Sequence, residues 1–249
     1  MIRASFLSIL FICFLCGAVA QQKNRKTGTP ALHTTPVKFM LITDSGTMIL
    51  RLYDSTPLHR DNFKKLLQQH YFDSLMFHRI IKDFMIQGGD PDSKNALPGI
   101  ELGNGGPGYS VPAEFDTSLF HKKGVIAAAR EGDAVNPLKA SSGSQFYIVQ
   151  GKKYTDAEMD AIENAKNIKI PESHRVVYRT IGGTPFLDMN YTVFGEVESG
   201  MDVIDKIAGA ARDARNRPLQ DIRMKMEIME EIKPGKGIKK VKQKHRAHE

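Results

Sequence analysis

The sequence predicts a mainly β protein, built as a closed or nearly closed antiparallel barrel. Short runs with β character recur along the chain between turn-forming residues, and helical patterns are few. No internal repeat accompanies them. Full closure is one way in which many short antiparallel strands avoid exposed sheet edges. The length of 249 residues, 41% of them hydrophobic, allows a sizeable core.

We expect the ordered part of the chain to begin near Val37. The stretch VKFMLITDSGTMILRLYD holds two β-like runs around Asp44-Ser45-Gly46, which is a hairpin signal. The next stretch, STPLHRDNFKKLLQQHYF, predicts a helix because Phe63, Leu66 and Leu67 fall on one face.

The rest of the barrel is predicted from shorter patterns. A strand-turn-strand unit is expected within 77–91, and single strands within 124–130, 144–151, 191–197 and 221–232. The segments 98–115 and 131–143 are loops by composition, and GMDVIDKIAGAA (200–211) predicts a short helix.

Residues 152–183 differ in character from their surroundings. Thr155 is a candidate N-cap with Glu158 three residues later, which is a capping-box pattern. A second helix is expected from Pro171, ending at Gly182-Gly183. We therefore expect a helical hairpin inserted between two strands.

The N-terminal segment 1–20 resembles a secretory signal. Arg3 precedes an apolar run that ends in Ala18-Val19-Ala20, and the run is short for a membrane span. Cleavage after this segment would remove both cysteines of the chain, Cys13 and Cys16. A lipoprotein carrying its lipid on Cys16 and an uncleaved membrane anchor are the alternatives. We expect export to the periplasm or cell envelope.

The charge is unevenly distributed. The net charge is +7, but residues 234–249 alone carry six Lys or Arg and one Glu, a net of +5. The near-neutral remainder does not predict specific nucleic-acid binding. Residues 21–36 are interpreted as a linker and 233–249 as a basic, disordered tail, with weak tail contact to an anionic surface as the alternative.

The stretch FHRIIKDFMIQGGDP, residues 77–91, places Arg79 and Gln87 among large apolar side chains. A two-residue loop in this hairpin would pair Arg79 with Ile86. A three-residue loop, 82–84, would pair Arg79 with Gln87 on one face and send Ile80 to the other. The second register makes a polar pair on an apolar exterior groove, but both registers remain possible from the residues alone.

Four blocks in this order, FHRIIKDFMIQGGD, GVIAAAR, GSQFYIVQG and YTVFGEV, resemble the cyclophilin family of peptidyl-prolyl cis-trans isomerases. The resemblance covers roughly 37–232 apart from the helical insert. It implies a closed antiparallel eight-stranded barrel with capping helices. Residues 37–232 would form this isomerase domain.

The resemblance also implies roles for individual residues. Arg79 would be the catalytic arginine. A proline pocket would be lined by Phe84, Met85, Tyr147, Phe186 and Leu187, and the peptide groove by Gln87, Ala129, Arg130 and Gln145. Tyr191 would close the pocket. Arg130, Phe186 and Tyr191 stand where better-known members often have Asn, Trp and His, and Tyr147 where Phe is usual.

The expected function is cis-trans isomerisation of X–Pro bonds in exported or unfolded proteins, which assists folding. No bond is made or broken, so no cofactor, nucleophile or metal is required, and the histidines show no metal-binding spacing. The expected partners are proline-containing polypeptides, and we expect a monomer. The alternative is a proline-peptide binding module or holdase chaperone with little turnover. His78 is expected to be a hydrogen-bonded structural histidine, and a hydrolase lacks a nucleophile signature.

Overall fold

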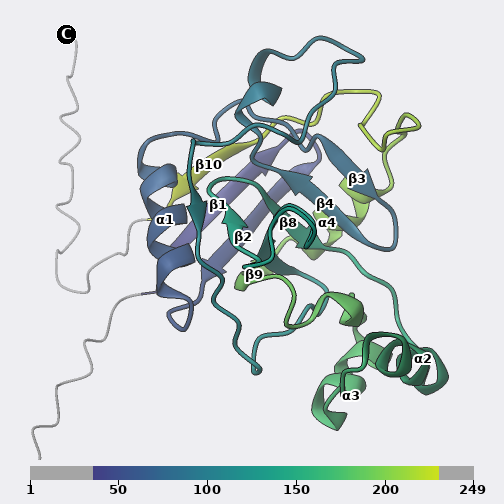
Figure 1. Cartoon of the computed structure of the whole chain (residues 1–249). Helices are drawn as coiled ribbons and strands as arrows, with labels where there is room; N and C mark the ends of the chain where they lie inside the picture. The colour runs from purple at the N-terminus through teal and green to yellow at the C-terminus, as the bar shows by residue number, and fades with distance from the viewer. Residues whose placement is uncertain (1–35, 230–249) are drawn as a thin grey trace, which may run out of the picture. The chain divides into compact units, whose positions relative to one another are not determined.

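The computed structural model describes residues 36–229, and Figure 1 follows the chain through them. The predicted signal segment, the tail and all of the linker except its last residue lie outside the described residues. Within 36–229, no helix combines the length and the apolar character needed to cross a membrane.

One curled, antiparallel eight-stranded sheet forms the body of the domain. Its strand order is β10-β1-β2-β9-β6-β8-β4-β3, and a separate two-stranded sheet pairs β5 with β7. The bounds are β1 Lys38–Thr43, β2 Gly46–Leu52, β3 Arg79–Ile81, β4 Met85–Gly88, β5 Ser110–Val111, β6 Val125–Ala128, β7 Ser141–Ser142, β8 Phe146–Val149, β9 Val193–Ser199 and β10 Lys225–Ile228.

The sheet is not closed, so the predicted closed barrel is wrong in this respect. The edge strands β3 and β10 do not pair with each other. Both are short, and the chain preceding each one fills the gap instead. Met76 forms an isolated bridge with Arg223, and backbone N–H groups of Ser74 and Phe77 donate to the carbonyls of Met224 and Ile222. These bonds satisfy backbone groups that an open edge would leave exposed.

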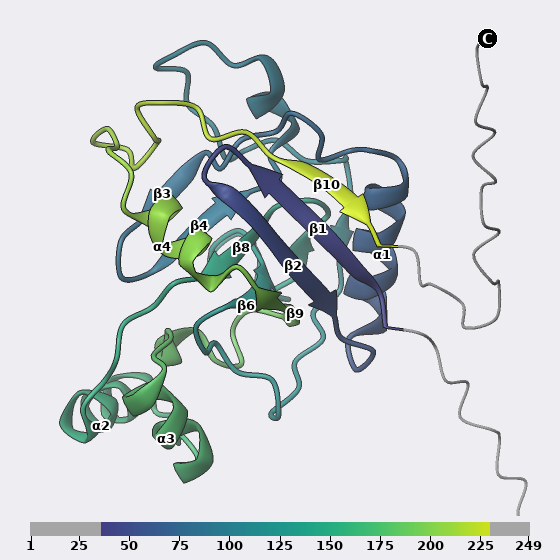
Figure 2. The same ribbon diagram turned by 180° about the vertical axis from the view of Figure 1, so that it is seen from behind.

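Two helices cover the ends of the curled sheet. Figures 1 and 2 show α1 (Pro57–Gln68) and α4 (Met201–Ala208) at opposite ends of it. The predicted face of α1 is confirmed, since Phe63, Leu66 and Leu67 are all buried. Burying one such side chain contributes about 1.5–3 kcal/mol.

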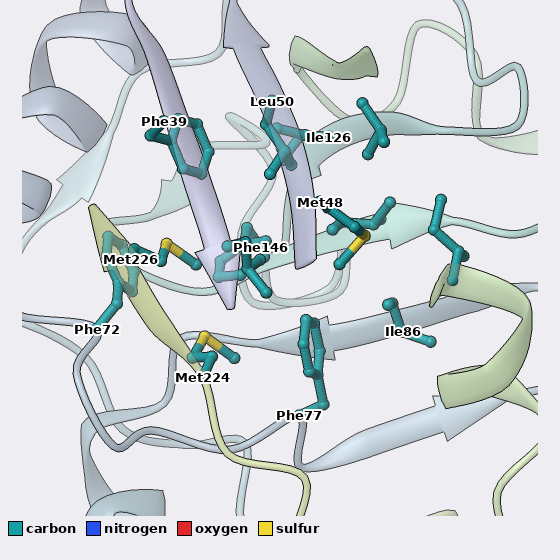
Figure 3. Packing of buried hydrophobic residues seen from close by; sticks show 14 of the residues in the cluster. Phe39, Met48, Leu50, Phe72, Phe77, Ile86, Ile126, Phe146, Met224 and Met226 are labelled. Carbon is teal, nitrogen blue, oxygen red and sulfur yellow. The ribbon is translucent and has the colours of Figure 1, made fainter. Parts of the chain in front are cut away.

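The core lies on the concave side of the sheet. Alternate residues of β1 and β2 point into it, as the period of a strand requires. Figure 3 shows Phe39, Phe72, Phe77 and Phe146 among the buried aliphatic and methionine side chains. The ring of Phe63 stacks on Phe72 with centroids 4.6 Å apart.

Residues 152–183 contain two helices, α2 (Asp156–Lys166) and α3 (Glu172–Thr180). The capping box predicted at Thr155 and Glu158 is present at the start of α2. Buried Tyr154, Met159, Ile170 and Tyr178 form a separate small core for this segment. Figure 2 shows α2 and α3 standing away from β1 and β2.

Candidate functional site

The β3–β4 hairpin adopts the register with the three-residue loop. Arg79 pairs with Gln87, Ile80 with Ile86 and Ile81 with Met85. Ile80 and Ile86 are both 0% exposed in the core of the curled sheet, so Arg79 and Gln87 lie on the opposite face. The sequence left two registers open, and the structure selects the one that gathers the polar pair.

A row of hydrogen bonds fixes the direction of the polar groups on this face. Gln145 Nε2 donates to the carbonyls of Gly103 and Gly105 at 2.9 and 2.7 Å. Its Oε1 therefore faces Gln87 and accepts from Gln87 Nε2 at 3.1 Å. The Oε1 of Gln87 is thereby left to accept from Arg79 Nη1 at 3.2 Å.

Arg79 is partly buried and uses little of its donor capacity. Its guanidinium carries five N–H donors, one of which meets Gln87. No carboxylate of residues 36–229 lies within 4.0 Å of it. Burial lowers the pKa of Arg79 from its ordinary value, although an arginine stays protonated in proteins. The site therefore presents a half-buried cation, several of whose N–H donors meet no acceptor among the described residues.

An apolar cavity of about 120 Å³ lies beside Arg79. Phe84 and Met85 come from the hairpin, Tyr147 from β8, and Leu187 from the short 3₁₀ helix η2 (Pro185–Leu187). Phe186 does not line this cavity. Its ring packs against Phe84 with centroids 5.7 Å apart, so it supports the wall from outside.

A larger hollow of about 570 Å³ adjoins the apolar cavity. The two share Gln87, Ala129 and Arg130 in their walls, and Gln145 lines only the larger one. The larger hollow is bordered by the glycine-rich loop 103–108. An extended peptide could therefore place one side chain in the apolar cavity and its neighbours in the adjoining hollow.

Arg130 holds the rim of the cavity with its side chain, which is only 4% exposed. Its Nε donates to the carbonyl of Asn190 at 2.8 Å, and its guanidinium carbon lies 4.6 Å from the centre of the Tyr191 ring. Asp133 pairs with it at 2.7 Å. The side chain of Arg130 thus packs on the ring of Tyr191 and holds the backbone just before it.

A model of the family described as “Cyclophilin type peptidyl-prolyl cis-trans isomerase/CLD” matches residues 38–228. The protein belongs to the cyclophilin family. The predicted enzyme class is thereby confirmed at the level of the family.

Named bacterial proteins resemble this cyclophilin. It is 33% identical over 190 residues to the “Putative peptidyl-prolyl cis-trans isomerase” of Staphylococcus haemolyticus, covering 75% of this chain and 87% of that protein. It is 36% identical over 196 residues to the “Putative bifunctional phosphatase/peptidyl-prolyl cis-trans isomerase” of Streptococcus pyogenes serotype M6. That match covers 76% of this chain and only 38% of the streptococcal protein.

Solved cyclophilin structures share the fold. A Cryptosporidium parvum cyclophilin aligns with a TM-score of 0.57 at 22% identity, over 79% of this chain and 99% of that one. A second structure of it, in the presence of the dipeptide Ala-Pro, aligns with a TM-score of 0.55 at 21% identity, over 78% and 99%.

Sequence reasoning anticipated most of the residues that this cyclophilin brings together. Two adjoining hollows collect every predicted site residue except Phe186: Arg79, Phe84, Met85, Gln87, Ala129, Arg130, Gln145, Tyr147, Leu187 and Tyr191. Their individual roles stay predictions. The reasoning missed His121 and Asp188, which lie behind the wall. Only the need of a buried tyrosine hydroxyl for a partner could have indicated them.

His78 lies on the other face of the hairpin, as expected, but it is not hydrogen-bonded. It is 4% exposed, and neither ring nitrogen has a partner among the described residues. Nor do residues 36–229 contain a group of three His, Cys, Asp or Glu suited to a metal ion.

Proposed function

We propose that this cyclophilin isomerises X–Pro bonds with Arg79 as its catalytic residue and the apolar cavity as its proline pocket. The observation that carries the proposal is the arrangement of Arg79. A half-buried guanidinium, with no carboxylate partner among residues 36–229, stands at the edge of a 120 Å³ cavity on the outside of the sheet. The Ala-Pro dipeptide present with the C. parvum cyclophilin supports a proline-containing peptide as the ligand.

The chemistry needs no covalent step. An X–Pro bond isomerises over a barrier of ~18–20 kcal/mol because the C–N bond has partial double-bond character. A donor near the prolyl nitrogen favours a pyramidal nitrogen with a localised lone pair, which weakens that double bond. The rigid fork of an arginine suits this task. The apolar wall holds the ring while the preceding carbonyl rotates.

The hydrogen-bonded row prepares Arg79 for this step. Because Gln145 is fixed by two loop carbonyls and Gln87 by Gln145, the oxygen of Gln87 restrains one guanidinium nitrogen. Little reorganisation is then needed when the substrate twists. One preorganised donor of this kind contributes about 10²–10³ in rate.

The test compares the protein with Arg79→Ala by exchange NMR of an Ala-Pro peptide, without a coupled protease. We expect the exchange rate of the peptide to fall by about 10²–10³ in the variant. Arg215→Ala is the matched control, because that arginine is 66% exposed and lines neither hollow. Equal rates for the parent and Arg79→Ala would refute the role of Arg79. Peptide binding without accelerated exchange would instead favour the binding module or holdase.

Export, the clients and the insert are further parts of this proposal. The signal-like residues 1–20 support exported client proteins in the periplasm or cell envelope. We also propose that residues 152–183 are a helical insert into the cyclophilin fold, that the domain acts as a monomer, and that the basic tail 233–249 is a solvated end. Fractionation of cells that express the full chain, with N-terminal sequencing of the product, tests export and cleavage.

A further inference from the structure

A chain of hydrogen bonds runs from the wall of the proline pocket to helix α3. Tyr147, on β8, has its hydroxyl oxygen 2.9 Å from Nε2 of His121. Nδ1 of His121 lies 2.9 Å from Oδ1 of Asp188, and the Tyr178 hydroxyl of α3 lies 2.7 Å from Oδ2 of Asp188. Tyr178 and His121 are 0% exposed and Tyr147 is 4% exposed.

Asp188 accepts at the centre of these hydrogen bonds. Asp188 Oδ1 accepts the backbone N–H of His121 at 2.8 Å as well as its ring Nδ1–H. Tyr178 donates to the other oxygen, and burial raises the pKa of its hydroxyl, which therefore keeps its proton. The other ring nitrogen of His121, Nε2, shares its hydrogen bond with the hydroxyl of Tyr147. Burial also raises the pKa of Tyr147.

The same carboxylate anchors the segment that supplies the opposite wall of the pocket. Asp188 directly follows η2, which carries Leu187 into the cavity and Phe186 against Phe84. Residues of α2 contact η2 as well. Asp188 therefore links three parts: the Tyr147 ring, the Leu187 wall and α3.

A buried polar chain of this kind is costly to interrupt. Removing the hydroxyl of Tyr178 takes a hydrogen bond from Asp188, whose side chain is only 15% exposed, and the remaining groups rearrange to recover one. A rearrangement at Asp188 moves the Tyr147 ring and Leu187 rather than the body of the barrel.

We propose that Tyr178 is a positioning residue for the proline pocket, acting through Asp188 and His121 on Tyr147. The α2–α3 segment thereby sets the affinity of the pocket for its peptide, although it contributes no residue to the cavity wall. This inference rests on the proposed function for the identity of the pocket. Tyr178 itself touches no substrate.

The test uses Tyr178→Phe in the full chain, with Tyr154→Phe as the matched control. Tyr154 belongs to the same small core and its ring faces that of Tyr178, but its hydroxyl makes no hydrogen bond to any described residue. Ala-Pro peptide is titrated into each protein by NMR, and Kd, KM and kcat are measured on the same samples. We expect Tyr178→Phe to raise Kd and KM about fivefold, with kcat within twofold of the parent. We expect Tyr154→Phe to leave Kd, KM and kcat unchanged.

A double-mutant cycle separates positioning from a general loss of stability. Tyr147→Phe removes the hydroxyl at the pocket end of the hydrogen-bonded series. In this background we therefore expect Tyr178→Phe to cause no further rise in Kd. An unchanged Kd in Tyr178→Phe, or an equal rise in both backgrounds, would overturn the inference. A parent that binds the peptide without accelerating its exchange would overturn the proposed activity, while the Kd values would still decide the role of Tyr178.

Discussion

His78 is a buried histidine that lowers the free energy of unfolding at acidic pH. Burial lowers its pKa to about 4, against an ordinary value of 6.5. The charge of Asp90 raises the pKa, whereas Arg79 and Arg217 lower it further. The folded protein therefore keeps this ring neutral over a pH range in which the unfolded chain would protonate it.

The sign of the effect on stability follows from the two pKa values. Between pH 6.5 and 4 the unfolded state binds the proton and the folded state does not, so the free energy of unfolding falls as the pH falls. We expect this one residue to account for about 2 kcal/mol of the loss between pH 7 and pH 5. Urea unfolding of the parent and of His78→Leu at the two pH values measures it.

A second buried histidine, His59, also affects how the free energy of unfolding depends on pH. Burial also lowers its pKa, so it contributes an acid-dependent loss in both proteins. Only the difference between the parent and His78→Leu reports His78. Equal pH dependence in the two proteins would show that folding does not lower the pKa of His78.

The position of Arg79 shows what could be predicted at the level of a residue. The alternation of apolar and polar residues limited the hairpin to two registers. The choice depends on Gln150, whose Oε1 accepts the backbone N–H of Asp83 in the turn at 2.6 Å. Asp83 adopts the left-handed conformation, with φ at 63°. Since Gln150 lies 67 residues away along the chain, local pattern could not supply this information.

Helix α1 depends on a distant side chain to begin. Thr56 stands at the N-cap position but makes no side-chain capping bond. Instead, Glu114 accepts the backbone N–H groups of Leu58 and His59 at 3.0 and 2.9 Å. The same carboxylate lies 2.7 Å from His59 Nδ1.

The line formed by Glu114, His59 and Ser141 has a structural role rather than a hydrolytic one. Nε2 of His59 lies 2.9 Å from the hydroxyl of Ser141, which resembles the order of groups in a catalytic triad. Ser141 is only 2% exposed, however, and Glu114 is already engaged at the helix terminus. The line connects α1 to β7.

We therefore expect Glu114→Ala to reduce the free energy of unfolding by about 2 kcal/mol, since it removes a cap and leaves Nδ1 of buried His59 without its partner. Urea denaturation measures the loss. Glu101→Ala is the control, because Glu101 is 72% exposed. If the two variants unfold at the same urea concentration, the capping role of Glu114 is wrong.

For the whole domain, sequence patterns predicted the class of fold better than its closure. Strand periodicity indicates an antiparallel barrel, and the resemblance carried by the four blocks implies helices that cap it. Closure depends on the lengths of β3 and β10, which begin only after Met76 and Arg223 have formed their bridge outside the ladders. Pattern cannot predict such lengths, because strand ends are decided by contacts between segments far apart in sequence.

The junction of the α2–α3 segment with the sheet makes a further prediction. A Cβ on Gly183 would stand 2.2 Å from the carbonyl oxygen of His121 and 2.6 Å from the ring of Tyr178. We expect Gly183→Ala to destabilise the whole domain by about 1–3 kcal/mol. The atom nearest to the new methyl group belongs to the backbone of His121, which moves less easily than the end of a side chain.

Thermal unfolding of Gly183→Ala beside Gly132→Ala checks this expectation. Nothing lies within 4 Å of a Cβ built on Gly132, so that variant reports the generic effect of the substitution. A midpoint for Gly183→Ala equal to that of Gly132→Ala would mean that the junction adapts freely.

The bridge between Lys152 and Gly183 means that the chain leaves the sheet and returns to it at one place. The ladders of the sheet are made without any residue between these two ends. An evolving or engineered sequence could lengthen, shorten or replace 153–182 while the strands keep their register. Such a change would spare folding, but it would break the link from Tyr178 to Asp188. On the proposed role of Tyr178, such changes would alter the affinity of the pocket for its peptide while the strands stay as they are.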